Sequence, residues 1–361
     1  MAVSRINEAG LNVNQYGNRN FIINGAMQVA QRGTSSTGVG ASNNVYPTCD
    51  RWEIETANSA GRATMTQESD GPDGFANSIK LACTTADTSV AAGEVFRLQQ
   101  VIEAQNLQSL AKGTSSAKQF TLSFYVKGNA AATYNVEIYD LDNTRHICAS
   151  FNVTTSWNRI SFTFDGDTTG AINDDNGGGF QVGIYLHAGS NYTSGTLATS
   201  WASVTNANRS SSSNTSFFDS TSRTFFITGV QLEVGDTATD FEHRSFADEL
   251  AKCQRYCVDL TPTSAPYLPA TGAVPHNNTA VAVTHVPLPV TMRAAPSVTV
   301  AAASDYSLYD GSTFTCTGVT VNGLGPNGGG INFSVSSGLT ARSALGIYTN
   351  GDKRTLIIAE L

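Results

Sequence analysis

The sequence predicts an all-β protein: a jelly-roll β-sandwich, then a short α-helix and a second, smaller β-sandwich domain. Three observations predict this class. Short segments alternate apolar with polar residues, Gly-, Asn-, Asp- and Ser-rich turns separate them at sandwich spacing, and no βαβ alternation is present. A chain of 361 residues is long enough for two or three domains with buried cores.

The first part of the chain, residues 1–45, is polar and rich in Asn, with little periodicity apart from the FIING run at 21–25. Such a segment buries little apolar surface by itself and becomes ordered by docking onto a partner. We therefore expect an N-terminal attachment arm.

The sandwich is expected over residues 46–243. Residues 119–127 (QFTLSFYVK) place four apolar side chains on one face, with the period of a strand. The same alternation recurs in four later segments, at 134–139, 159–164, 180–186 and 224–230.

An amphipathic helix is expected over residues 244–258. Ser245 and Asp248 have the spacing of a capping box. Apolar side chains then recur every three or four residues, at Phe246, Leu250, Cys253 and Cys257. This stripe is a candidate contact between copies of the chain, and packing within one chain is an equal alternative.

Three prolines between residues 261 and 269 predict a stiff spacer, which we assign to 259–278. Five further alternating segments come after it. They predict a distal C-terminal β domain over residues 279–361.

Charge and composition exclude several classes of protein. The net charge is −8, whereas a nucleic-acid binder needs a basic patch. No apolar run approaches the roughly 20 residues of a membrane helix, and the first residues lack the apolar stretch of a secretion signal. We therefore expect a protein made inside a cell, with its six cysteines reduced and buried.

No metal or cofactor is expected. Cys253 and Cys257 lie four residues apart, but no second pair of ligands comes after them. Residues 323–328 match G-x-G-x-x-G, but the next segment is a strand, so they predict a hairpin loop. Residues 165–170 (DGDTTG) begin like a calcium loop, but Asn176 occupies the twelfth position. We favour a solvated acidic turn there, with calcium as the alternative.

The chain is not expected to be an enzyme. No G-x-S-x-G motif is present, and the five histidines are scattered singly. A polysaccharide depolymerase stays open, because glycosidase carboxylates come together only in the folded chain.

Aromatic residues offer a better indication of function. Sugars stack on Tyr and Trp rings while amide and carboxylate groups bind their hydroxyls. Trp52 and Trp157 lie in patterned segments and are predicted to be core residues. The candidate carbohydrate-binding residues are Tyr185, His187, Tyr192 and Trp201 in the first domain and Tyr306 and Tyr309 in the second.

Three stretches resemble proteins of one kind. Residues 20–34 (NFIINGAMQVAQRGT), with Asp-Arg-Trp at 50–52, resemble the opening of many tailed-phage fibre and virion proteins. Residues 226–244, with the run GVQLEVG, and the Cys-Gln-Arg-Tyr sequence at 253–256 resemble the same proteins. Residues 287–296 (PLPVTMRAAP) are similar to the segment after the helix in those proteins.

The resemblance covers most of residues 20–296 and implies a virion structural protein with a jelly roll like that of carbohydrate-binding modules. One departure concerns residues 228–230. The carbohydrate-binding jelly rolls of secreted enzymes often end with an Asp-Asp-Val strand at this place, which supplies calcium ligands. This chain has Thr-Gly-Val instead. The resemblance therefore does not extend to that ion or, by simple analogy, to sugar binding.

From the residues and the resemblance we expect a homotrimeric phage fibre, because many virion fibres are trimers. Its expected location is the virion, where the N-terminal arm binds another virion protein and the rest binds host-surface polysaccharide. The first alternative is a capsid head fibre or decoration protein. A depolymerase and a free-standing carbohydrate-binding module are weaker alternatives.

Overall fold

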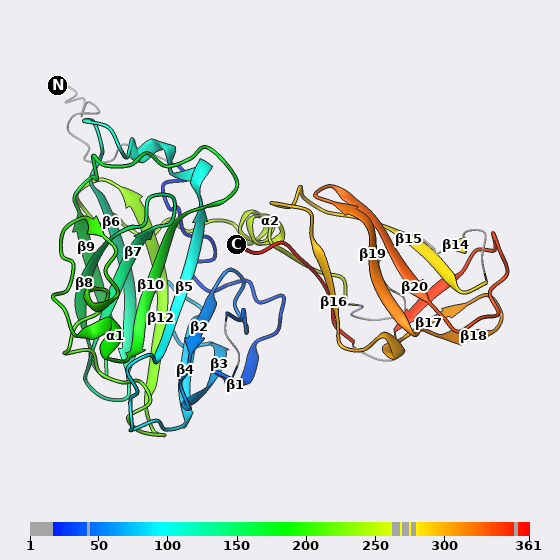
Figure 1. Ribbon diagram of the computed structural model, residues 1–361, viewed down its shortest axis with the longest axis horizontal. Helices are drawn as coiled ribbons and strands as arrows, with labels where there is room; N and C mark the ends of the chain where they lie inside the picture. The colour runs from blue at the N-terminus through cyan, green and yellow to red at the C-terminus, as the bar shows by residue number, and fades with distance from the viewer. Residues whose placement is uncertain (1–16, 42–43, 262–267, 269–273, 276–278, 350–352) are drawn as a thin grey trace, which may run out of the picture. The chain divides into compact units, whose positions relative to one another are not determined.

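The computed structural model is nearly all β, which confirms the predicted class (Figure 1). It divides into two compact units, Met1–Glu249 with Leu361, and Leu250–Glu360. The structure describes residues 17–41, 44–261, 268, 274–275, 279–349 and 353–361.

Unit 1 is a sandwich of two six-stranded antiparallel sheets. Sheet A contains, in spatial order, β1 (Ser35–Val39), β3 (Arg62–Glu68), β4 (Ser78–Thr85), β12 (Thr224–Val234), β6 (Phe120–Gly128) and β9 (Asn158–Phe164). Sheet B contains β11 (Ala202–Ser203), β8 (Arg145–Val153), β7 (Ala132–Asp140), β10 (Gly178–Ala188), β5 (Val95–Glu103) and β2 (Glu53–Ala57). The short helices η2 (Ala104–Leu110), α1 (Ser190–Thr193) and η3 (Asn206–Asn208) lie in connections.

One apolar core fills the space between the two sheets. In β6 the four apolar side chains of the alternating pattern are all buried, as the sequence predicts. Trp52 is buried as well, which confirms its assignment to the core. Polar residues between these positions point to the outer faces of the sheets.

The described part of the expected arm belongs to the sandwich. Ile22, Met27 and Val39 are buried in its core, and β1 pairs with β3. The prediction of a separate arm over 1–45 is therefore wrong for the described residues from 17 onward. The pattern hid this, because turns with positive φ at Asn24 and Met27 interrupt any strand or helix period. Residues 1–16 lie outside the described residues.

Helix α2 (Phe246–Gln254) begins at the predicted capping box. Ser245 Oγ accepts from the Asp248 amide at 3.2 Å and donates to its carboxylate at 2.6 Å. The helix is shorter than predicted, because Cys257 already lies in strand β13 (Cys257–Asp259). No helix among the described residues has the length and apolarity to cross a membrane.

Unit 2 contains three antiparallel sheets. Their spatial orders are β13, β22 (Thr355–Ile358), β16 (Ser297–Val300); β14 (Val274–Pro275), β15 (Val281–Pro287), β20 (Gly328–Ser334), β19 (Gly318–Gly325); and β18 (Thr313–Thr315), β17 (Tyr306–Tyr309), β21 (Gly346–Thr349). The short helix η4 (Ala303–Asp305) precedes β17. A second core lies within these sheets.

The second domain begins earlier than residue 279, because β13 pairs with β22. Most of the predicted spacer, 259–278, lies outside the described residues. The G-x-G-x-x-G stretch at 323–328 joins β19 to β20, which confirms the predicted hairpin loop.

Candidate functional site

Charged and polar side chains line the outer face of sheet B. On β7, Glu137 stands between the core residues Val136 and Ile138 and therefore points away from the core. Its neighbour across the sheet is Gly183 on β10. Arg97 of β5 passes beside Gly183, where an added Cβ would lie in ordinary contact with it, 3.7 Å from its Cδ and 3.8 Å from its Nη1.

Glu137 is the centre of a buried ion network. Its carboxylate accepts from Arg209 Nη2 at 2.7 Å, Arg97 Nη1 at 3.2 Å and the Tyr185 hydroxyl at 3.2 Å. His146 Nδ1 lies 2.8 Å from its second oxygen. Burial raises the pKa of Glu137, but hydrogen bonds from His146 and Arg209 and the nearby guanidinium charges outweigh burial and lower it to about 2.

Arg97 extends the network to the edge strand β2. Its guanidinium donates to Glu55 at 2.8 Å and to Gln181 at 3.1 Å. Glu55 is partly exposed, so the network runs from a buried centre to solvent.

The connection between β10 and β12 covers part of this face. Its residue Arg209 lies over the rings of Tyr139 and Tyr185, with ring-centre distances of 5.0 and 5.8 Å. Ser210 and Asn214 of the same connection accept from the Asn135 amide at 3.0 and 2.8 Å. The connection is therefore packed onto the sheet, with its serines among the polar contacts.

We call this constellation the sheet B site and define it by Glu55, Arg97, Glu137, Tyr139, Gln181, Tyr185, Tyr192 and Arg209. Tyr139, Tyr192 and Glu55 are partly exposed at its rim, and the central groups are buried and mutually bonded. Chemically, it offers fixed donors and acceptors beside partly exposed rings.

The structure brings two of the predicted sugar-binding residues into this site. Tyr185 and Tyr192 have ring centres 6.3 Å apart. Tyr192 is partly exposed, but Tyr185 is fully buried, so Tyr185 has no ring face on which a sugar can stack. Its contribution is the hydroxyl that bonds Glu137.

His187 does not reach the site. A bulge in β10 between Tyr185 and His187 turns it to another environment. The ring is fully buried, with Nε2 3.0 Å from a Glu94 oxygen and Nδ1 2.8 Å from Ser216 Oγ. Both nitrogens are occupied, so His187 is not available to a ligand.

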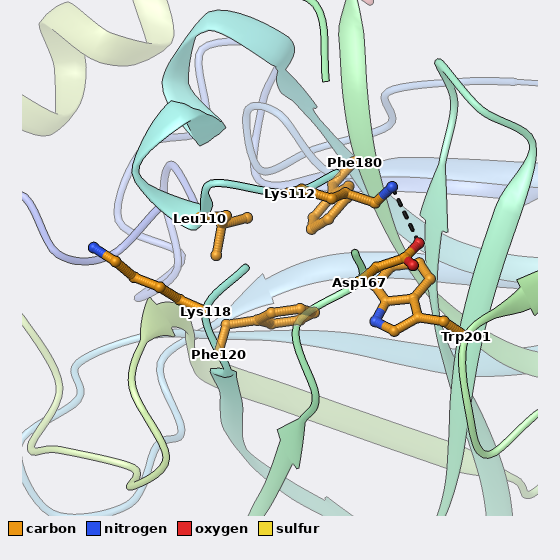
Figure 2. A pocket seen from close by; sticks show the side chains of 7 residues that line it. All are labelled: Leu110, Lys112, Lys118, Phe120, Asp167, Phe180 and Trp201. Carbon is orange, nitrogen blue, oxygen red and sulfur yellow. Dashed lines mark ion pairs between the residues drawn. The ribbon is translucent and has the colours of Figure 1, made fainter. Parts of the chain in front are cut away.

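Trp201 lies elsewhere in unit 1, where it lines a pocket (Figure 2). Its indole nitrogen donates to the Asp165 carbonyl at 2.7 Å, and its ring centre is 5.9 Å from that of Phe180. The other lining residues are Leu110, Lys112, Lys118, Phe120 and Asp167.

The turn at 165–170 is organised by a lysine. Lys112 Nζ is 2.8 Å from the carbonyl oxygens of Thr169 and Gly170, 3.1 Å from an Asp167 oxygen and 2.5 Å from Asp140. Asp167 is buried, so the prediction of a solvated acidic turn is wrong for this residue. The buried ammonium group supplies positive charge where the calcium alternative required an ion.

Two other groups have a composition that can hold a metal. They are Glu137, His146 and Cys148, and Asp87, Glu94 and His187, all buried. The Glu137 carboxylate already binds two arginines, and burial raises the pKa of the Cys148 thiol, which a metal needs as a thiolate. The group around Glu137 is therefore a poor metal site.

In unit 2 the two candidate tyrosines point to opposite sides of β17, because they are three positions apart. Tyr306 is fully buried and bonds Thr355 Oγ1 at 2.5 Å, so it has no surface for a sugar. Tyr309 is 42% exposed, with its ring centre 5.6 Å from that of Tyr348.

Only part of the apolar stripe predicted to form a contact between copies of the chain is accessible to solvent. Cys253 and Cys257 are fully buried within the chain, so they have no surface to offer to another copy. Leu250 is partly buried, and Phe246 is 57% exposed.

The sequence pattern misplaces Trp157. It predicts a core position, but Trp157 is partly exposed just before β9, beside Phe226 on the outer face of sheet A. The turn-forming Thr154–Ser156 run before it is the signal that could have indicated this.

Comparison with known proteins gives distant structural similarity only. No protein-family model matches the sequence, and no curated protein gives a significant match. Several of the similar solved structures are carbohydrate-binding modules. One described as "CBM4 structure and function" is 18% identical, with 58% of this chain and 97% of that chain covered and a TM-score of 0.31.

A family 61 module solved with β-1,4-galactotriose is 12% identical, covers 60% of this chain and 99% of its own, and has a TM-score of 0.30. Tailspike protein 4 of bacteriophage CBA120, in its enzymatically active domain, is 13% identical over 60% of this chain and 21% of that chain, with a TM-score of 0.28. At such TM-scores none of these similarities carries a functional argument.

Proposed function

We propose that unit 1 binds polysaccharide, without cleaving it, at the sheet B site. The observation that carries this proposal is the ion network around Glu137, which stands on an outer sheet face rather than in the core. Burying paired charges rarely adds stability by itself, so such a network favours a role in recognition.

The site has both kinds of group that a sugar needs. Arg97, Gln181 and Glu55 are held by hydrogen bonds before any ligand arrives, which reduces the entropy lost on binding. Tyr139 and Tyr192 are partly exposed and offer ring surface to the apolar face of a pyranose.

The ionisation of Glu137 supports binding without hydrolysis. A glycosidase needs one carboxylic acid with a raised pKa as its proton donor. The pKa of Glu137 is lowered, so this carboxyl stays ionised at neutral pH. The other carboxylate of the site, Glu55, is bonded to Arg97.

We further propose that the chain is a phage fibre that works in the virion and attaches it to host-surface polysaccharide. The resemblance of residues 20–34 and 226–244 to tailed-phage virion proteins supports this setting. For a homotrimer, the exposed Phe246 and the partly buried Leu250 are the remaining contacts of the predicted stripe. Attachment to another virion protein through the N-terminal part of the chain belongs to the same proposal.

The test is binding of fluorescently labelled full-length protein to candidate host cells, with polysaccharide extracted from those cells as competitor. We expect saturable binding that the polysaccharide abolishes. Tyr139→Ala weakens it about tenfold, which corresponds to about 1.4 kcal/mol. Tyr309→Ala is the matched control, because it removes an exposed tyrosine from unit 2.

Each other outcome has a distinct meaning. No binding by the folded protein refutes the proposal and favours the head-fibre alternative, which labelling of whole particles then tests. Release of reducing ends from the polysaccharide establishes a depolymerase instead. Equal losses in Tyr139→Ala and Tyr309→Ala refute the assignment to sheet B.

A further inference from the structure

The outer face of sheet A carries a second group of aromatic and charged side chains. Trp157 precedes β9, and Phe226 on β12 stands opposite Lys127 on β6. The two rings meet edge to face, with centres 6.2 Å apart and an angle of 76°, and both are partly exposed. Neither ring is part of the core between the sheets.

Hydrogen-bonding groups surround these two rings. Asp70 accepts from Lys127 Nζ at 2.5 Å and from the indole nitrogen of Trp157 at 3.3 Å. Lys127 Nζ lies 4.8 Å from the ring centre of Phe226 and 5.1 Å from that of Trp157. Lys80 lies 5.5 Å from the Phe226 ring and pairs with Glu68 at 3.2 Å.

We call this group the Trp157 patch and define it by Glu68, Asp70, Lys80, Lys127, Trp157 and Phe226. Asp70 and Glu68 are 42% and 37% exposed, so their oxygens reach solvent. The Trp157 ring is held by Asp70 and Lys127 in the absence of a ligand, so little side-chain freedom remains to be lost on binding.

The same face continues beyond the patch. Tyr125 lies two positions before Lys127 on β6, and its ring centre is 5.3 Å from that of Phe75. Both rings lie over Gly229, where an added Cβ would be 2.8 Å from Phe75 and 2.9 Å from Tyr125. Two pairs of rings on one sheet face suit a polymer with several sugar units better than a single monosaccharide.

We infer that the Trp157 patch is a second saccharide site, so that one chain binds two polysaccharide strands at once and cross-links them. This inference rests on the proposed function of the sheet B site. The two sheets enclose one core, so their outer faces point in opposite directions. A strand seated on one face is therefore separate from a strand seated on the other.

The deciding measurement is the number of oligosaccharides bound per chain. The probe is a set of short oligosaccharides cut from the extracted host polysaccharide, titrated calorimetrically into the full-length protein. We expect two per chain for the unchanged protein and one per chain for Trp157→Ala. Tyr139→Ala, which alters only the sheet B site, leaves one strong site and one site that is about tenfold weaker, and the double variant keeps only the weaker one.

Controls separate a lost site from a misfolded protein. Trp157→Phe keeps a ring and retains the second site with weaker binding, and Asp70→Asn tests the group that orients the indole. Cross-linking of the intact polysaccharide, measured by light scattering, supports the count. It does not replace the count, because a trimer with one site per chain also cross-links.

Three results overturn the inference. One oligosaccharide per chain, unchanged in Trp157→Ala, refutes the second site and leaves the proposed function standing. No binding by any form refutes both. If Trp157→Ala leaves the sugar count at two and instead prevents incorporation into particles, the patch is a docking surface for a virion protein.

Discussion

Replacing Glu137 by Gln tests the network at the centre of the sheet B site. The variant keeps the shape of the side chain but removes the negative charge that two buried guanidinium groups share. Arg97 retains Glu55, whereas Arg209 loses its carboxylate partner. Breaking a buried ion pair from one side costs about 3–5 kcal/mol, and we expect about 3 kcal/mol because Glu55 remains.

The pH dependence of stability distinguishes this charge effect from a simple packing defect. The pKa of Glu137 is about 2 in the folded protein and 4.5 as the ordinary value. A carboxyl group whose pKa is lowered by folding stabilises the fold at pH values above its unfolded pKa. This stabilisation is lost as the pH falls toward its folded pKa. Between pH 7 and pH 3 the loss is about 2 kcal/mol, and Glu137→Gln lacks this component.

The assay is urea unfolding at both pH values, monitored by tryptophan fluorescence. All three tryptophans, Trp52, Trp157 and Trp201, lie in unit 1, so the signal reports that unit. We expect the variant to be less stable at pH 7 and to differ less from the unchanged protein at pH 3. Equal stability at pH 7, or the same difference at both pH values, refutes the reasoning.

Three further predictions concern other parts of the fold. Lys112→Met leaves the carboxylates of Asp140 and Asp167 without their shared cation and lowers the free energy of unfolding by about 3 kcal/mol; a change below 1 kcal/mol on urea unfolding contradicts this. Gly229→Ala places a side chain at φ +62° beneath two rings and costs about 2 kcal/mol by the same assay, so an unchanged midpoint contradicts the strain argument. Burial raises the pKa of the Cys49 thiol to about 12, and all six cysteines are buried, so a thiol reagent at pH 8 reacts only after unfolding.

The strands could be predicted because their signal is local. Alternation along residues 119–127 shows which side chains share a face, and one of the two faces is buried in either sheet. The same pattern says nothing of the residues that cover the other face. The sequence predicts that Tyr185 is open to ligands, but Arg209 and the connection that carries it fold back over the ring. That contact joins residues distant in sequence.

The buried charges could not be predicted for the same reason. Lys112 meets Asp140 and Asp167 across 28 and 55 positions of sequence, and no spacing rule links such residues. By contrast, the capping box at Ser245 and the hairpin loop at 323–328 depend on neighbours within six residues, and the structure confirms both. Trp157 is an intermediate case. It lies next to the end of a strand, and the local sequence pattern there is the same whether the ring faces the core or the outer side of the sheet.

The charge balance of the two proposed sites predicts the kind of attraction they exert. The residues that define the sheet B site include two arginines and two glutamates, and those of the Trp157 patch include two lysines, one aspartate and one glutamate. Each set is neutral and internally paired, so neither attracts a charged polymer over long range. We therefore expect the affinity for the extracted polysaccharide to change less than about threefold between 0.05 M and 1 M NaCl, where a charge-driven complex loses far more. A steep salt dependence would show that the ion pairs open to bind an anionic sugar, and the argument from stacking and fixed hydrogen bonds would then be wrong.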